Sequence, residues 1–117
     1  MTDLIDTSTV IADLRAGIYR AGFISVITLV EILRGIAEEK RKEVKKLLEA
    51  GFEVVDLDNE VIEKYCILYS DLRAKGQSLP DAHLLIAASA KSRDLDLVSS
   101  DEHFQRLGEL GPRVRRP

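Results

Sequence analysis

Four short apolar runs that alternate with helical segments constrain the fold of this chain more than any other feature. They occupy residues 4–5, 23–27, 52–55 and 95–98, and each is typical of a buried strand. Capping residues and the 3.6-residue spacing of apolar side chains predict helices that begin near residues 7, 28, 59 and 81, and the first three end at glycines 17, 51 and 76. A short helix near residues 101–107 and an edge strand at 113–115 complete the pattern.

Strands separated by helices are joined by right-handed crossovers, which produce a parallel sheet with helices on both faces. The sequence therefore predicts an α/β fold, a three-layer α/β/α sandwich built on a short parallel sheet. At 117 residues the chain has the length of a single domain, which we expect to span residues 1–117.

The composition narrows the possible classes of function. One cysteine, Cys66, excludes an intramolecular disulfide framework and a cysteine-based zinc cluster. No apolar run reaches the roughly 18 residues of a membrane span, and the first residues lack a signal-peptide pattern, so we expect a cytoplasmic protein without a membrane partner. A net charge of −3 argues against nucleic-acid binding by bulk positive charge, unless several carboxylates surround a cation.

Four carboxylates fall where the predicted fold would bring them to one cleft. Asp6 directly follows the first strand, Glu31 lies four residues after the second, and Asp101 lies three residues after the fourth. Since ligands bind outside the carboxyl ends of parallel strands, these three acids share one edge of the sheet, and Asp81 at the start of a buried helix can lie beside it. Clustered carboxylates favour a bound Mg²⁺ or Mn²⁺, which can activate a water molecule to attack a phosphodiester.

Each acid also has a purely structural interpretation. Glu31 would complete a capping box with Thr28, and Asp81 would interact favourably with a helix dipole. Asp101 would cap the last helix, and Asp6 would open a turn. The joint placement of four acids at one edge of one sheet favours a site over these local explanations.

Four sequence blocks resemble the signature blocks of PIN-domain ribonucleases, and most closely those of VapC-type toxins from prokaryotic toxin–antitoxin pairs. The blocks occur in the order of the family, cover nearly the whole chain and read LIDTS (4–8), ISVITLVEI (24–32), DAHLLIA (81–87) and LVSSDEHF (97–104). The resemblance implies an endoribonuclease that depends on Mg²⁺ or Mn²⁺ and cleaves RNA with an acidic quartet. The catalytic and metal-binding residues of this quartet would be Asp6, Glu31, Asp81 and Asp101.

The resemblance also implies supporting residues and partners. Thr7 or Ser8, and Ser99, match positions whose hydroxyl groups support the site in the family. Relatives commonly form homodimers and are inhibited by an antitoxin whose C-terminal segment covers the cleft, so we expect a homodimer, an RNA substrate and a cognate VapB-like antitoxin. The predicted helix 59–75 agrees with such contacts, because its apolar stripe is wider than packing on one sheet face requires.

The two histidines and the cysteine have structural interpretations. His83 lies two residues after Asp81 and therefore points to another side of the helix, so we interpret it as structural. His103 lies near the predicted cleft, and Cys66 lies on an apolar helical face that is typical of the core.

Two other functions stay open at this point. The chain could be a stand-alone PIN-type RNA-processing nuclease, or a catalytically silent module of the same fold that binds RNA or protein. A response-regulator receiver domain is disfavoured, because Asp6 is followed by Thr7 rather than by a second acid and no lysine follows Lys91. A small upstream gene that encodes a DNA-binding N-terminus would favour the toxin.

Overall fold

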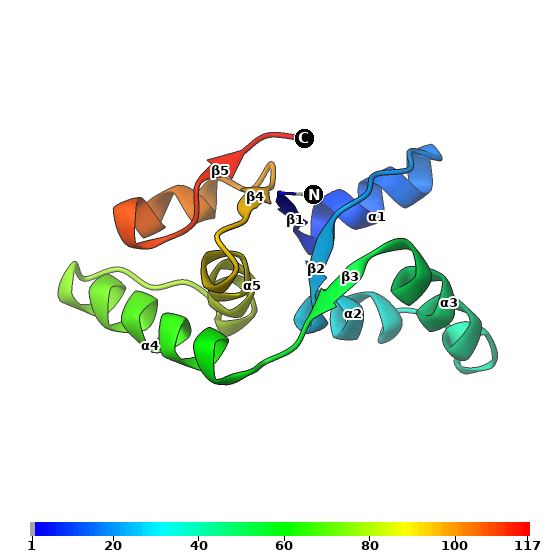
Figure 1. Ribbon diagram of the computed structural model, residues 1–117, viewed down its shortest axis with the longest axis horizontal. Helices are drawn as coiled ribbons and strands as arrows, with labels where there is room; N and C mark the ends of the chain where they lie inside the picture. Colours follow the sequence, from blue (N-terminus) through cyan, green and yellow to red (C-terminus); the bar gives the residue numbers. More distant parts are fainter. Residues whose placement is uncertain (1) are drawn as a thin grey trace.

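The computed structural model describes residues 2–117 as a small sheet placed between helices (Figure 1). The strands are β1 (Asp3–Ile5), β2 (Phe23–Ser25), β3 (Glu53–Val55), β4 (Asp96–Val98) and β5 (Val114–Arg115). The helices are α1 (Thr7–Ala16), α2 (Val26–Leu33), α3 (Glu38–Gly51), α4 (Asn59–Ala74), α5 (Asp81–Ser92) and the 3₁₀ helix η1 (Glu102–Leu110). Within residues 2–117, no helix combines the length and the apolar character that crossing a membrane requires.

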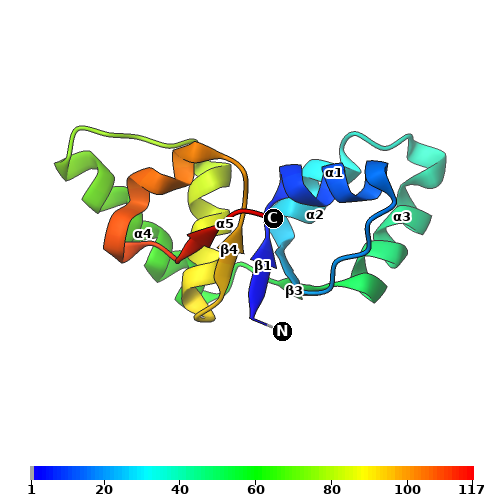
Figure 2. The ribbon, with the colours of Figure 1, turned by 90° about the horizontal axis from the view of Figure 1, so that it is seen from above.

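The five strands form one parallel sheet in the order β3-β2-β1-β4-β5. Figure 2 shows α1, α2 and α3 on one side of this sheet and α4, α5 and η1 on the other. The predicted three-layer α/β/α sandwich with a short parallel sheet is therefore confirmed. Because the chain proceeds outward from β1 to β3 and then returns to place β4 on the other side of β1, the strand order reverses between β1 and β4. Ligands of open parallel sheets bind at such a reversal.

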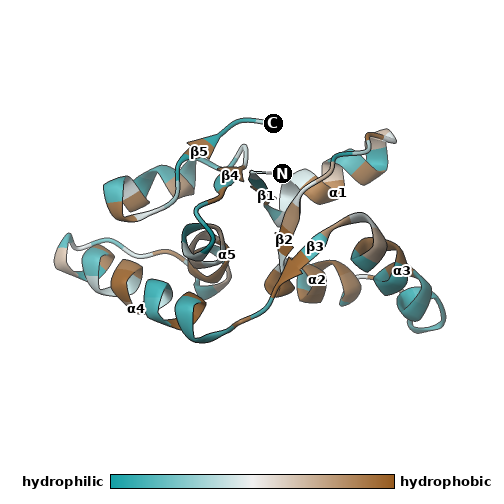
Figure 3. Ribbon diagram, viewed as in Figure 1, coloured by the Kyte–Doolittle hydropathy of each residue, from teal (hydrophilic) through white to brown (hydrophobic). Residues whose placement is uncertain are grey.

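Alternating side chains along the strands divide the core into two halves. In β1, Leu4 packs into the cluster formed with α4, α5 and η1, whereas Ile5 packs into the cluster formed with α1, α2 and α3. The same alternation separates Leu97 from Val98 in β4. In Figure 3 the strands β2 and β3 are largely brown, whereas α3 and α4 carry broad teal stretches. The sheet therefore contributes apolar side chains to two cores, one on each of its faces.

The single long helix predicted over residues 28–51 is wrong, because the structure has two helices there. The chain leaves helical geometry around Gly35, between the end of α2 and the start of α3. Glycine costs about 1 kcal/mol in a helix interior relative to alanine, which favours a break at this position. The guanidinium of Arg41 donates hydrogen bonds to the carbonyls of Leu33 and Ile36, at 3.2 and 3.1 Å, and so ties the start of α3 to the end of α2 and to the segment between them.

One face of α4 stays exposed instead of packing in the core. Cys66 is exposed, so its assignment to the core is wrong. Ile62 and Tyr69, which lie on the same face of the helix, are 50% and 41% exposed. The apolar stripe of this helix is therefore wider than the surface it covers within the chain.

Candidate active site

A cleft of about 270 Å³ opens beside the residues that follow β1 and β4, where the strand order reverses. Both walls come from the N-terminal turns of helices that begin at this edge of the sheet. The residues that line the cleft are Asp6, Thr7, Ser8, Ile11, Glu31, Ala82, His83, Ile86, Asp101 and Phe104. Three of the four predicted acids, Asp6, Glu31 and Asp101, therefore share one cleft, and Asp81 is not part of its lining.

Asp6 is the most buried acid of the cleft, at 4% exposure. It caps α1, because its Oδ1 accepts a hydrogen bond from the backbone N–H of Thr9 at 3.0 Å. Its Oδ2 accepts hydrogen bonds from the hydroxyls of Ser99 at 2.5 Å and Ser8 at 3.2 Å. These donors fix the carboxylate in place, and Oδ1, which accepts one hydrogen bond, keeps lone-pair capacity for a further partner.

Glu31 reaches the cleft from the second turn of α2. Its Oε1 accepts a hydrogen bond from the Thr7 hydroxyl at 2.7 Å, and the same hydroxyl lies 3.0 Å from that of Thr28. The capping-box interpretation of Thr28 and Glu31 is wrong, because α2 is capped by Ser25, whose hydroxyl accepts from the backbone N–H of Ile27 at 3.0 Å. Thr28 therefore lies inside α2, and its hydroxyl helps to position the Thr7 hydroxyl that binds Glu31.

Asp101 is linked to Asp6 through the Ser99 hydroxyl, which accepts a hydrogen bond from the backbone N–H of Asp101 at 2.9 Å. Asp101 also caps η1 by accepting from the backbone N–H of His103 at 2.9 Å. Partial burial alone would raise the pKa of Asp101, but the hydrogen bonds from the His103 N–H and from His83 outweigh it and lower this pKa below its usual value. Asp101 is therefore an anion at neutral pH.

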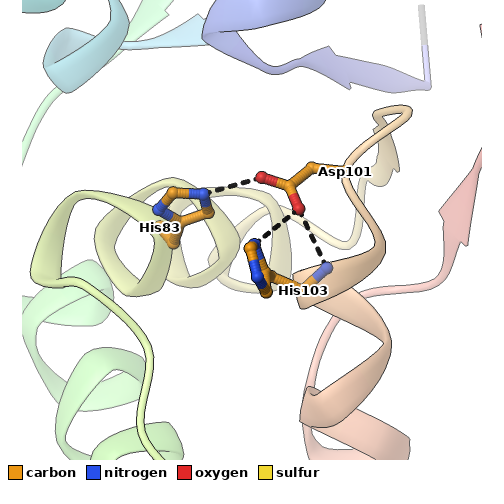
Figure 4. A group of neighbouring side chains, drawn as sticks. All are labelled: His83, Asp101 and His103. Carbon is orange, nitrogen blue, oxygen red and sulfur yellow. Dashed lines mark hydrogen bonds and ion pairs between the residues drawn. The ribbon is translucent and has the colours of Figure 1, made fainter.

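His83 points to a different side of α5 from Asp81, as expected, but this is the side that faces the cleft, so its interpretation as a structural residue outside the site is wrong. Its Nε2 is 2.9 Å from Oδ2 of Asp101, and Nδ1 of His103 is 2.9 Å from the other oxygen, Oδ1 (Figure 4). The ring of His83 also packs against Phe104, with ring centroids 5.2 Å apart. The imidazole of His83 and the carboxylate of Asp101 thus form part of the cleft wall, and His103 binds the same carboxylate from beside the cleft.

Asp81 points away from the cleft toward α4. Its Oδ1 accepts a hydrogen bond from the hydroxyl of Tyr65 at 2.6 Å. This hydrogen bond, helped by partial burial, raises the pKa of Tyr65 to about 12. Consecutive helical residues are rotated by about 100°, so side chains two residues apart lie on different sides of a helix. Asp81 and His83 therefore cannot face the cleft together, and in the structure His83 does.

The donor set of the cleft fits a divalent cation. Asp6, Glu31 and Asp101 each contribute a carboxylate to the lining of this cleft, and hard oxygen donors are the ligands that Mg²⁺ and Mn²⁺ prefer. Within residues 2–117, few basic side chains contact these acids. The guanidinium of Arg34 lies 3.8 Å from the carboxylate of Glu31 and is 72% exposed, and the two histidines contact Asp101. The negative charge of the cleft is thus largely uncompensated by lysine and arginine.

Several known proteins are similar to this chain in sequence and in fold. The sequence model of the PIN domain matches residues 4–110. Ribonuclease VapC1 of Methanocaldococcus jannaschii is 37% identical over 92 residues, which are 78% of this chain and 68% of that protein. The solved structure of DNA-bound VapBC from Salmonella typhimurium has a TM-score of 0.86 at 24% identity, covering 99% of this chain and 98% of that chain. VapBC-5 from Mycobacterium tuberculosis has a TM-score of 0.71 at 25% identity, with the same coverage.

A match over most of the chain, a curated relative and a shared fold agree with one another. The chain therefore belongs to the PIN domain family, and within that family it belongs with the VapC-type ribonucleases.

Proposed function

We propose that this protein is a metal-dependent endoribonuclease, with residues 1–117 as a single nuclease domain, and that it is the toxin of a type II toxin–antitoxin pair. The observation that carries the proposal is the convergence of three carboxylates, from Asp6, Glu31 and Asp101, in a cleft at the strand-order reversal. Its relation to the ribonuclease VapC1 supports the same reaction class.

We assign metal binding to the three acids of the cleft, with Thr7, Ser8 and Ser99 as the hydroxyls that orient them. A bound Mg²⁺ or Mn²⁺ would supply charge stabilisation at the scissile phosphate and a water molecule of lowered pKa. Asp81 would have to leave Tyr65 to take part, so we give it a smaller role than the sequence pattern suggests.

The substrate that fits this cleft is RNA in single-stranded or loop form. The carboxylates lie at the edge of a sheet between helix ends, where a flexible strand can bring its phosphate close. A regular A-form duplex presents its backbone less readily to such a site. Both the substrate and an antitoxin would be met in the cytoplasm, which is the location we propose.

Cleavage of a single-stranded RNA in Mg²⁺ or Mn²⁺ tests the proposal. We expect cleavage to stop in EDTA and to fall at least a hundredfold in Asp6→Asn, because a buried ligand is removed while the shape of the side chain is kept. Asp81→Asn is the matched comparison and should keep much more activity, since the Asp81 carboxylate binds the Tyr65 hydroxyl and does not line the cleft. An Asp6→Asn protein that cleaves as well as the wild type, after purification away from host ribonucleases, would contradict the assignment.

An apolar surface between the end of α1 and α3 supports an antitoxin partner. Leu14, Ile18 and Tyr19, at the end of α1 and in the segment that follows, are 55%, 52% and 83% exposed, and Leu47 of α3 is 66% exposed. These four side chains line one groove with a volume of about 180 Å³. Amphipathic segments bind such grooves through apolar side chains at regular spacing. The VapBC relatives are themselves toxin–antitoxin systems, which agrees with this partner.

Co-expression with the neighbouring gene tests the antitoxin. We expect its product to co-purify with this protein and to inhibit RNA cleavage. Cleavage without any inhibitory neighbour would favour a stand-alone RNA-processing nuclease. Metal binding without cleavage of any RNA would favour a silent binding module of the same fold.

The exposed face of α4 supports a homodimer. Ile62, Cys66 and Tyr69 offer an apolar surface on one side of this helix, and aromatic side chains are enriched at protein interfaces. Light scattering should give about twice the 13.1 kDa mass of the chain. Ile62→Asp should reduce the mass to that of the monomer, and a wild-type monomer at high concentration would contradict the proposal.

A further inference from the structure

A second group of potential metal ligands lies at the cleft and shares Asp101 with the three acids. His83 on α5, Asp101 after β4 and His103 on η1 each offer one ligand atom, and these atoms all lie within 4.8 Å of one another. Figure 4 shows both imidazole rings directed at the same carboxylate. This group combines two nitrogen donors with one oxygen donor, whereas Asp6 and Glu31 offer oxygen alone.

The spacing of these atoms is close to that of ligands around one metal ion. Ligand atoms at about 2.0–2.1 Å from a tetrahedral Zn²⁺ are separated from one another by roughly 3.3 Å. The two nitrogen-to-oxygen distances here are both 2.9 Å, each to a different oxygen of the Asp101 carboxylate, and one ligand atom from each residue lies within 4.8 Å of the others. A bound ion would therefore replace the two nitrogen-to-carboxylate contacts after a small outward shift of the side chains.

The charge of the group also favours a cation. Asp101 carries a negative charge, and the side chains of residues 2–117 that lie within ion-pair distance of it are the two imidazoles, which are charged only when protonated. Imidazole binds metals in its neutral form, so two neutral rings and one carboxylate leave a net charge of −1 at this place. A divalent ion would compensate it.

Two of the three ligands are held in position by the surrounding structure. The Ser99 hydroxyl accepts a hydrogen bond from the backbone N–H of Asp101, and Asp101 in turn caps η1. The ring of His83 packs against Phe104, which is 2% exposed. His103 is more exposed, at 56%, and can adjust to an entering ion. The capping of η1 by Asp101 accounts for the proximity of Asp101 and His103. It does not account for the contact between the His83 imidazole and the same carboxylate.

We propose that His83, Asp101 and His103 bind a divalent transition metal of borderline softness, such as Zn²⁺ or Co²⁺, beside the acids of the cleft. Imidazole nitrogen suits these ions better than Mg²⁺, which prefers oxygen and keeps its water ligands. Because Asp101 would serve both groups of ligands, occupancy by Zn²⁺ should weaken the binding of Mg²⁺ or Mn²⁺ to the neighbouring acids.

The small number of histidines makes a direct test possible. The chain has only two histidines, so a protein labelled with ¹⁵N in histidine gives four ring-nitrogen signals. One equivalent of Zn²⁺ at neutral pH should shift Nε2 of His83 and Nδ1 of His103, while an equivalent of Mg²⁺ should leave both rings nearly unchanged. Co²⁺ should give visible absorption bands of a site with nitrogen ligands.

Calorimetry on variants locates the ion. We expect Zn²⁺ affinity to fall at least tenfold in His83→Asn and in His103→Asn, and by a larger factor in the double variant. His103 is exposed, so His103→Asn should fold even if a substitution within α5 disturbs packing. Glu31→Gln is the comparison variant, and it should keep its Zn²⁺ affinity within about twofold.

Besides a failure of the wild type to bind Zn²⁺, two results would overturn the inference. One is unchanged Zn²⁺ affinity in His103→Asn and in the double variant. The other is an equal loss in Glu31→Gln, which would locate the ion among the acids. RNA cleavage with Mg²⁺ by a wild-type protein that does not bind Zn²⁺ would reject this inference alone. Zn²⁺ binding without RNA cleavage in Mg²⁺ would reject the proposed function alone.

Discussion

Removal of the Ser99 hydroxyl should both destabilise the protein and weaken its active site. This hydroxyl donates to Oδ2 of Asp6 at 2.5 Å and accepts from the backbone N–H of Asp101 at 2.9 Å. Ser99 and Asp6 are 2% and 4% exposed, so water cannot easily replace either partner. In Ser99→Ala, a buried carboxylate oxygen loses its shortest hydrogen bond and the N–H of Asp101 loses its acceptor.

The expected loss of stability follows from these two bonds. A hydrogen bond to a charged group is worth about 1.5–3 kcal/mol, so we expect Ser99→Ala to lower the free energy of unfolding by about 2 kcal/mol. The unfolding entropy of a chain of this length is about 2.1 cal/mol/K per residue, so this loss lowers Tm by roughly 8 °C. Residues that orient metal ligands typically change metal affinity or activity by about 10–100-fold when they are removed, so RNA cleavage should fall within that range.

Thermal unfolding and RNA cleavage measured on three variants test this reasoning. Ser100→Ala is the matched control, because Ser100 is the adjacent residue and is exposed. Ser99→Thr keeps the hydroxyl and should recover most of the activity that Ser99→Ala loses. A Ser99→Ala protein with the Tm and activity of Ser100→Ala would refute the reasoning, since the hydroxyl would then contribute nothing to either carboxylate.

Three further predictions concern other contacts. Thr7→Val removes the hydroxyl that donates to Glu31 at 2.7 Å, so Mn²⁺ affinity measured by calorimetry should fall about tenfold with an unchanged circular dichroism spectrum. Tyrosinate absorbance should show one tyrosine, Tyr65, that ionises near pH 12, and Asp81→Asn should lower its pKa. Because the folded-state pKa is raised, the contribution of the Tyr65–Asp81 hydrogen bond to the free energy of unfolding is present below about pH 10 and lost between about pH 10 and 12. Arg41→Ala should lower the free energy of unfolding by about 1 kcal/mol in urea, because the carbonyls of Leu33 and Ile36 lose their hydrogen bonds from the guanidinium.

The sequence predicted the fold well where local and tertiary preferences agree. Each strand of the sheet begins within one residue of its expected position, because the strands are short apolar runs bounded by turns. The prediction of one continuous helix over residues 28–51 was wrong for a physical reason. The apolar period continues through the break, and Gly35 alone costs only about 1 kcal/mol in a helix. The hydrogen bonds of Arg41 that accompany the break join residues five and eight positions apart, which a periodicity does not report.

The predicted placement of acids at one edge depended on topology, and three of them follow from it. Asp6, Glu31 and Asp101 are attached to strand ends or to the helix that follows a strand, and parallel strands bring such positions together. The hydroxyl network of Thr7, Thr28 and Ser99 was only partly visible, because Thr28 had an equally good local explanation as a helix cap.

The rotation of α5 about its axis could not be predicted from its own residues. This helix is buried on most of its sides, so its apolar pattern does not indicate which polar side chain of the first turn faces the cleft. Asp81 and His83 are related by about 200° of rotation, so only one of them can do so. Tyr65, which is 16 residues away on α4, binds Asp81 and accounts for the orientation seen. The missing information was therefore a contact between two helices, and its consequence is an imidazole where the sequence pattern alone suggested a fourth carboxylate.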